Sequence, residues 1–549
     1  MNENTHTLNS EQERLFEILV KDKQDDWKTY SKRTNIKVWK GIVEKYPETA
    51  HFIYELIQNA DDTAATDVKI LLFKDKLVFK HNGKRQFSIT DAREQTGEIG
   101  DINSITSVGC STKEDEEQTI GKFGVGFKSV FQYTDTPSIY DDTFWFKIEN
   151  YIIPTLLEND HELRNAGETL FELPFKDPEK AYPEILQRLQ NLNMPVLFLP
   201  HIQKITWCID GEEMIHEYSK EVIQTGERHG IKYEFCRIHE YDKNLLMYLF
   251  HRDCNTIKGK YNISVGFYVN PDGSLDIDAK GQIYCFFPTS EHFDSCFVSH
   301  APFLLVDNRD SIKRYEDINQ KFLNCIAELA SDALLCLKEI GECRNSRLLE
   351  SEDNEISTTN KNILINDNIF HILNIKSTEY KDSYLRQCYF RIVRDNKLLL
   401  NRSKRYASIN DVFSATIDLE NLISSSQIAQ LCQNNDRDFL YLKQYRSDFK
   451  EVEAELKIKP FDNEYLAKHI SNSFMANQPL EWAHRLLTYI EDKARVLWRS
   501  DEPRTISDTW SAFSVDSWNK LKFRFASIAK TQDGEWISPY YLYKKNANV

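Results

Sequence analysis

Glu55-Leu-Ile-Gln-Asn59-Ala-Asp-Asp62 is the stretch of sequence that decides the fold. It lies in a predicted helix that starts near residue 48 and ends near residue 62, and whose other face carries the apolar residues Phe52, Ile53, Leu56 and Ile57. Glu55 and Asn59 are four residues apart, so they share one face of that helix. A carboxamide oxygen can coordinate Mg²⁺ there, and a carboxylate beside it can orient or deprotonate a water. The alternative interpretation is a solvated polar helix face.

A glycine-rich turn, Gly121-Lys-Phe-Gly-Val-Gly-Phe-Lys-Ser129, follows a polar segment at residues 94–120 that is predicted to be a mobile loop. Three close glycines let backbone N–H groups approach a phosphate, and a following helix points its positive end at the anion. The turn does not fit a Walker loop, because Phe127 separates Gly126 from Lys128. It does not fit a Rossmann motif, because no strand directly precedes it. The alternative interpretation is a tight turn with close packing.

In this order, the two motifs resemble those of the GHKL ATPases, which include heat-shock-ninety chaperones, MutL, gyrase-type topoisomerases and histidine kinases. Two further segments fit the same pattern. Gly109-Cys-Ser-Thr-Lys113 is similar to the lid of these proteins, and Gly167-Glu-Thr169 resembles the strand that closes their pocket. The resemblance implies a Bergerat fold that binds ATP and Mg²⁺.

By position, the resemblance implies that Asn59 holds Mg²⁺ and that Glu55 positions the attacking water. It also implies that Thr169 helps to bind adenine and that the glycine-rich turn cradles the phosphates. Lys113 would reach a phosphate from the lid, and a solvated lysine is the alternative. The expected nucleotide contacts are Asn59, Asp62, His81, Asn82, Gly83, Lys113, Gly121, Gly124, Val125, Gly126, Phe127 and Thr169.

One position departs from the family pattern. The family's first glycine motif usually begins with Asp, which accepts a hydrogen bond from the adenine amino group, whereas this chain has His81-Asn82-Gly83. A neutral imidazole nitrogen or the Asn82 carbonyl could accept the same hydrogen bond. The alternative for His81 is a residue at a strand end that caps a turn. The departure therefore bears on adenine selectivity.

The departure also points to one branch of the family. His81-Asn-Gly83, Leu197–Trp207 and Gly281–Pro288 together resemble the sacsin-type branch over about residues 35–340. In the same region, the segment around Arg309 resembles the middle-domain loop whose arginine reaches the γ-phosphate in heat-shock-ninety chaperones. A cation there would stabilise charge on the transferring phosphoryl group. The alternative is a surface ion pair with a neighbouring aspartate.

The sequence predicts an α+β fold. Residues 1–180 are expected to form a Bergerat ATPase sandwich, a mixed sheet with helices on one face, after N-terminal helices. Residues 181–345 are expected to form an α/β middle, transducer-like domain, and 346–368 a linker. The mostly helical region 369–549 is expected to contain two short hairpins, near residues 390–400 and 529–537. Further predictions are strands at 196–199, 205–209 and 283–287, and helices at 10–45 and 318–340.

Composition restricts the class of protein. The formal net charge of −16 disfavours a general nucleic-acid binder. The 11 cysteines form no CxxC pair, and neither a signal peptide nor a membrane span is apparent, so a cytoplasmic protein with reduced thiols is expected. The two expected hairpins are weakly similar to each other, as the units of an internal repeat are, so the chain could belong to a longer parent protein. Expected partners are ATP or ADP and a protein client or partner subunit, with a homodimer as an open alternative.

The expected function is an ATP-binding, slowly hydrolysing conformational clamp of sacsin or heat-shock-ninety type, an ATPase with a chaperone-like or remodelling role. Microbial sacsin-type proteins resemble parts of defence systems, so such a role is one expectation. Two alternatives stay open. One is a nucleic-acid-acting clamp similar to MutL or the MORC proteins, and the other is a nucleotide-switched scaffold without turnover.

Overall fold

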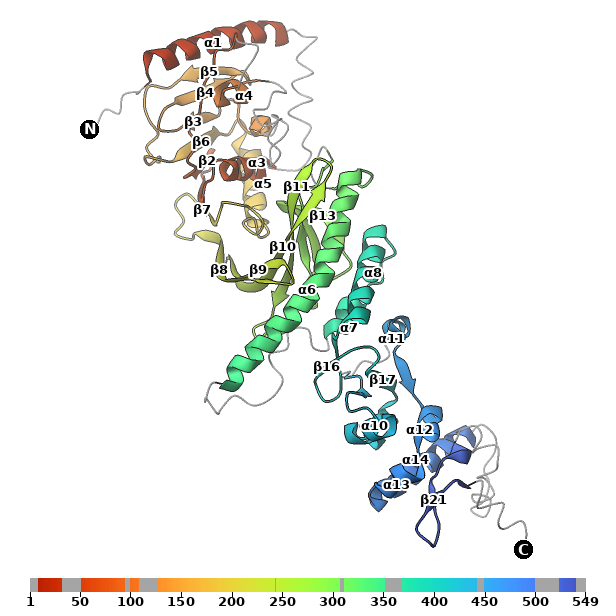
Figure 1. Ribbon diagram of the computed structural model, residues 1–549. Helices are drawn as coiled ribbons and strands as arrows, with labels where there is room; N and C mark the ends of the chain where they lie inside the picture. The colour runs from red at the N-terminus through yellow and green to blue at the C-terminus, as the bar shows by residue number, and fades with distance from the viewer. Residues whose placement is uncertain are drawn as a thin grey trace. The chain divides into compact units, whose positions relative to one another are not determined.

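The computed structural model describes residues 8–31, 51–93, 99–107, 127–241, 243–306, 311–350, 368–441, 449–498 and 523–539 (Figure 1). The chain divides into two units, Met1–Cys336 and Leu337–Val549. The first unit contains one large sheet, and the second contains helices with small sheets.

The sheet of the first unit has fourteen described strands in the order β13-β12-β14-β11-β10-β9-β8-β7-β1-β2-β6-β3-β4-β5. Most neighbours are antiparallel, but β1 pairs with β7, and β12 with β14, in parallel, so the sheet is mixed. The strands are β1 (Asp67–Leu72), β2 (Lys76–His81), β3 (Ser138–Tyr140), β4 (Trp145–Glu149), β5 (Ile153–Leu156), β6 (Thr169–Pro174), β7 (Lys204–Ile209), β8 (His216–Arg228), β9 (Ile231–Glu240), β10 (Lys243–Thr256), β11 (Gly259–Val269), β12 (Gly281–Cys285), β13 (Phe287–Phe293) and β14 (Val298–His300).

Helices cover one face of the first part of this sheet. The apolar residues of α1 (Ser10–Tyr30), α3 (Phe52–Asp62) and α5 (Pro178–Gln190) share one buried core with alternate residues of β1, β2, β6 and β7. Val68, Ile70 and Leu72 point into that core, whereas Leu71 packs against a second, smaller core on the opposite face. This period-two alternation is what the sequence of a half-buried strand encodes. The short helices α4 (Asp101–Ile105) and η1 (Phe127–Gln132) complete this part.

The later part of the sheet is a run of long antiparallel strands, β8 to β11, with α6 (Asp317–Glu350) beside β10 and β11 (Figure 1). Asp332 of α6 forms an ion pair with Arg252 of β10 at 2.7 Å, and the Phe322 ring lies 5.5 Å from that of Tyr261 in β11. The helix predicted at 318–340 is confirmed.

The strand predicted at residues 196–199 is wrong. This segment is irregular, and its apolar side chains Leu197 and Phe198 fill a core together with residues of β9, β10, β12 and β14. A short apolar run is compatible with a strand or with a buried loop, and only the tertiary structure decides between them. The strands predicted at 205–209 and 283–287 correspond to β7, and to β12 with the start of β13.

The second unit contains α7 (Asn368–Leu373), α8 (Tyr380–Asp395), α9 (Ile417–Leu422), α10 (Ser425–Cys432), α11 (Lys450–Leu456), α12 (Asn463–His469), α13 (Asn472–Ala476), α14 (Leu480–Trp498) and η3 (Phe523–Phe525). Its described strands are β15 (Leu399–Leu400), β16 (Tyr406–Ala407), β17 (Val412–Ala415), β18 (Asp438–Phe439), β19 (Lys459–Phe461), β20 (Ala529–Lys530) and β21 (Trp536–Ile537), in three small sheets.

One of the two hairpins predicted in this unit is misplaced. Residues 390–395 belong to α8, whose buried residues Leu385, Tyr389 and Val393 recur every four positions, as a helix requires. The nearby antiparallel pair is β15–β16 instead. The second hairpin, β20–β21, forms as expected, and Gly534 in its turn has a φ of +87°.

The α+β class with a mixed sheet is therefore confirmed. The predicted domain boundaries at 180 and 345 stay predictions, although one sheet runs across the first of them. In the part of the chain that the structure describes, no helix has the length and apolarity needed to cross a membrane.

Candidate functional site

The helix α3 begins and ends close to where the sequence predicts, and it is more buried than a solvated polar face would be. Glu55 is only 4% exposed, and Asn59 is partly exposed. The imidazole Nε2 of His51, one turn earlier, lies 3.6 Å from Glu55 Oε1. Burying a carboxylate is costly unless it is paired or hydrogen-bonded. The interpretation of Glu55 as part of a solvated face is therefore wrong.

Asp61 has a role that the sequence did not reveal. Its side chain is 1% exposed, and Oδ1 accepts hydrogen bonds from the backbone N–H groups of His201 and Ile202, at 2.9 and 2.8 Å. Burial raises the pKa of this carboxyl, and the two hydrogen bonds act against the rise. The partners are about 140 residues away in sequence, so no local pattern could indicate them. Asp61 fixes the end of α3 to the segment that leads into β7.

His81 and Asn82 both use their acceptor atoms within the protein. His81 Nδ1 accepts a hydrogen bond from the Gly83 N–H at 3.1 Å, and burial lowers the pKa of the imidazole to about 4. The neutral ring therefore carries its proton on Nε2. Asn82 Oδ1 accepts from the N–H groups of Thr66 and Asp67, both at 2.9 Å. His81, at the position where the resemblance leads one to expect an aspartate, thus offers a donor at Nε2.

Thr169 lies directly opposite His81 in the pairing of β2 with β6. It is 2% exposed, and its hydroxyl has no hydrogen-bond partner among the described residues. A buried hydroxyl without a partner costs about 1–3 kcal/mol. A ligand that bonds to this hydroxyl would recover that free energy.

Gly83 joins this edge of the sheet to the end of α3. A Cβ atom at Gly83 would lie 1.9 Å from Thr63 Oγ1 and 2.8 Å from His81 Nδ1, so no other residue fits without movement. The Lys84 N–H donates to the Thr63 carbonyl at 3.0 Å. The predicted Mg²⁺-binding helix and the predicted adenine edge are thereby brought together.

The segment that follows the glycine-rich turn is anchored by a buried lysine. Lys128 is 1% exposed, and its Nζ donates to the carbonyls of Ile105 and Tyr151 at 2.6 and 2.9 Å. Burial lowers the pKa of Lys128 to about 7. The helix η1 that begins at Phe127 packs against α3, and the ring of Phe52 lies 5.4 Å from that of Tyr133. The segment that directly follows the glycine-rich turn therefore lies beside α3.

Six of the predicted site residues lie outside the described residues: Lys113, Gly121, Gly124, Val125, Gly126 and Arg309. The segments on either side of Arg309 are described. Leu305 and Ile312 form an antiparallel bridge, and the Asn319 side chain of α6 bonds to the backbone of Leu304 and Lys313. The described ends of the segment that contains Arg309 are therefore held by the start of α6.

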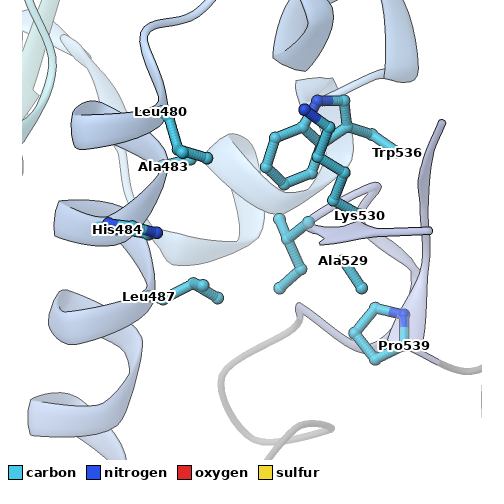
Figure 2. A pocket seen from close by; sticks show the side chains of 9 residues that line it. Leu480, Ala483, His484, Leu487, Ala529, Lys530, Trp536 and Pro539 are labelled. Atoms are coloured by element: carbon cyan, nitrogen blue, oxygen red, sulfur yellow. The ribbon is translucent and has the colours of Figure 1, made fainter. Parts of the chain in front are cut away.

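A cavity of about 320 Å³ lies in the second unit, which holds none of the predicted site residues. Figure 2 shows one face of α14 opposite the β20–β21 hairpin, with the Trp536 ring facing the helix. The lining is mostly apolar: Leu480, Ala483, His484, Leu487, Ile528, Ala529, Lys530, Trp536 and Pro539. The lining offers no carboxylate, in contrast to the site around α3.

Comparison with known proteins finds similarity over part of the chain. Residues 33–149 match the family model of the sacsin domain. Over 210 residues, the chain is 30% identical to the protein NO VEIN of Arabidopsis thaliana, and over 110 residues it is 34% identical to human sacsin. These matches cover 33% and 18% of this chain, but only 7% and 2% of the two relatives. The sacsin-type resemblance is confirmed at this level, while the nucleotide site stays a prediction.

Among the described residues, no group of three or more His, Cys, Asp or Glu side chains is placed to hold a metal ion. The predicted Mg²⁺ site differs in kind, because it needs a single amide oxygen of Asn59 together with phosphate oxygens and water. Hard oxygen donors of this type suit Mg²⁺, which usually keeps several waters.

Proposed function

We propose that the sacsin-type region binds Mg-ATP between α3, the glycine-rich turn and the edge formed by β2 and β6. The observation that carries the proposal is the Thr169 hydroxyl, which is buried and without a partner among the described residues beside the donor nitrogen of His81. A hydrogen-bonding ligand at that edge offsets the cost of burying the hydroxyl. The contacts of Gly83 with the end of α3 support a single site.

Each residue has a proposed task. Asn59 holds Mg²⁺ through its amide oxygen, and Mg²⁺ when bound neutralises charge on the phosphates. Glu55 orients the attacking water, and His51 at 3.6 Å keeps that carboxylate in place. His81 donates from Nε2 to a ring nitrogen of the base, because its Nδ1 is occupied by Gly83. Arg309 and Lys113 supply cations to the phosphates, and the backbone of the glycine-rich turn cradles them.

At the level of the whole protein, we propose a slow ATPase that works as a conformational clamp of the chaperone or remodelling type. Two features support this. One continuous sheet contains both β2 and β6 of the proposed site and the strands beside α6, and Asn319 of α6 bonds to the segments that flank Arg309. The net charge of −16 weighs against the nucleic-acid-acting alternative. A nucleotide-switched scaffold without turnover is the second candidate, favoured by the missing acceptor at His81.

Phosphate release from the full chain distinguishes these two candidates. The proposal predicts steady release in the presence of ATP and Mg²⁺ that is lost on substitution of Glu55. Saturable ATP binding without any phosphate release would favour the scaffold instead.

A further inference from the structure

A pair of thiols lies where α6 meets the strand β10 of the large sheet. Cys254 on β10 and Cys325 on α6 are 71 positions apart in sequence, yet their Sγ atoms lie 2.7 Å apart. Both belong to the first unit. Cys254 is 2% exposed, whereas Cys325 is partly exposed, so a small solute can reach one of the two sulfurs.

The surroundings of the pair favour a reactive thiol at Cys325. The hydrogen bond from Cys254 lowers the pKa of Cys325 to about 7, and the positive charges of Lys321 and Arg252 act in the same direction. Burial and, to a smaller extent, the charge of Glu328 on the same helix raise the pKa and so act in the opposite direction. The thiolate is the nucleophilic form of cysteine, and reactive cysteines occupy electropositive, partly exposed positions of this kind.

We propose that Cys254 and Cys325 form a disulfide when the protein meets a small hydroperoxide, and that this bond fastens α6 to β10. The Cys325 thiolate attacks a peroxide oxygen, the O–O bond breaks, and the departing hydroxide leaves as water after it takes up a proton. The sulfur of Cys254 then attacks the resulting sulfenic acid, the S–O bond breaks, and a second water leaves with the Cys254 proton. The two thiols lose two electrons in total, and hydrogen peroxide is reduced to two waters.

The bond would strengthen a junction that already exists. The ion pair between Arg252 and Asp332 and the contact between Tyr261 and Phe322 connect the same helix to the same part of the sheet. Asn319, which holds the segments that flank Arg309, lies on the first turns of that helix. A disulfide at Cys325 therefore restrains the helix whose Asn319 holds Leu304 and Lys313. The proposal does not depend on nucleotide binding.

The test treats the reduced full chain with hydrogen peroxide, alkylates the remaining thiols, and maps cross-linked peptides by mass spectrometry without reduction. The expected result is a peptide pair joined through Cys254 and Cys325, which dithiothreitol separates. The thermal midpoint of the oxidised chain should rise by several degrees, because the bond closes a long loop in the unfolded chain.

Two variants and one control make the result specific. Cys254→Ser and Cys325→Ser should each abolish the cross-link and the rise in midpoint. Cys336→Ser should retain both, because Cys336 on the same helix lies outside the pair and its sulfur contacts the backbone carbonyl of Arg228. If Cys254→Ser fails to fold, the partly exposed Cys325 still provides a test. Separate alkylation of both thiols after peroxide treatment, or sulfinic acid at Cys325 without a cross-link, would overturn the proposal.

Discussion

Replacement of Thr169 by valine tests whether the hydroxyl binds nucleotide or only packs in the core. If the hydroxyl binds nucleotide, the substitution should raise the free energy of unfolding and weaken the affinity for Mg-ATP. The hydroxyl is buried in β6 without a partner among the described residues, so the free protein carries a desolvation cost of about 1–3 kcal/mol. Valine has nearly the same shape and removes that cost. Thr169→Val should therefore raise the free energy of unfolding by about 1 kcal/mol, which is part of the desolvation cost of the buried hydroxyl.

Under the proposed function, the same substitution removes a hydrogen bond to the bound base. A lost hydrogen bond to a neutral group weakens binding by about 0.5–1.5 kcal/mol, so the Kd for Mg-ATP should rise roughly 2- to 10-fold. Calorimetric titration gives the Kd, and denaturant unfolding gives the stability. Thr169→Ser, which keeps the hydroxyl, should retain the affinity.

Thr289 provides a matched control in the same sheet. It is also buried, but its hydroxyl donates to the Ile283 carbonyl at 2.9 Å and accepts from the Glu291 N–H at 3.2 Å. Thr289→Val should therefore lower the free energy of unfolding by about 1 kcal/mol and leave ATP affinity unchanged. If Thr169→Val also destabilises the protein, or if its Kd for Mg-ATP equals that of the wild type, the reasoning about this hydroxyl is refuted.

Four further predictions concern buried side chains. Glu55→Ala should keep ATP affinity within a few-fold and reduce phosphate release by about 10²–10⁴-fold, and undiminished release would exclude Glu55 as the group that positions water. Asp61→Ala leaves two backbone N–H groups without their acceptor, so denaturant melts should show a loss of about 2–5 kcal/mol, and a neutral result would contradict its anchoring role. His81→Asp restores a base acceptor, so ATP should gain about tenfold over GTP in competition titrations, whereas unchanged selectivity would place the base elsewhere. Burial lowers the pKa of His81 to about 4 and that of His300 to about 3, both from 6.5. Between pH 6.5 and the lowered pKa of each ring, the unfolded chain binds a proton that the folded chain does not. The free energy of unfolding should therefore fall as the pH drops below about 6.5, by about 3 kcal/mol or more per histidine. A free energy of unfolding that does not change with pH would show that these rings are not buried as neutral groups.

The sequence predicted the elements whose pattern is local. The helix α3 follows from apolar residues at helical spacing, and β1 and β2 follow from alternation on either side of a short turn. The family resemblance implied that Thr169 and His81 both contact adenine. The structure adds that they are paired residues of neighbouring strands, although β6 is almost 90 residues further along the chain than β2. The sequence could not show that Thr169 lacks a partner, because that depends on every neighbour in space.

The remaining features depend on tertiary contacts. The apolar run at residues 196–199 resembles a strand, yet Leu197 and Phe198 are loop residues in a core. Asp61 and Asp62 are adjacent and chemically identical, and only the position of His201 and Ile202 makes Asp61 the anchor. The thiol pair of Cys254 and Cys325 is equally invisible in sequence, because it joins β10 to α6 across 71 positions.

The donor state of His81 shows how the structure changes an interpretation. From the sequence, a neutral imidazole could replace the family aspartate as an acceptor. The Gly83 N–H occupies the available lone pair, so the free nitrogen carries a proton. In the proposed site, the contact of His81 with the base therefore has the opposite polarity to the one expected from the sequence, so the selectivity between ATP and GTP tests the proposal.

Isothermal titration of the full chain with ATP in the presence of Mg²⁺, with Asn59→Ala in parallel, examines the core of this account most directly. We expect a saturable heat that fits one nucleotide per chain, weakens at least tenfold in Asn59→Ala and falls when Mg²⁺ is chelated. The absence of any saturable signal at millimolar ATP, or equal binding by the wild type and Asn59→Ala, would contradict it.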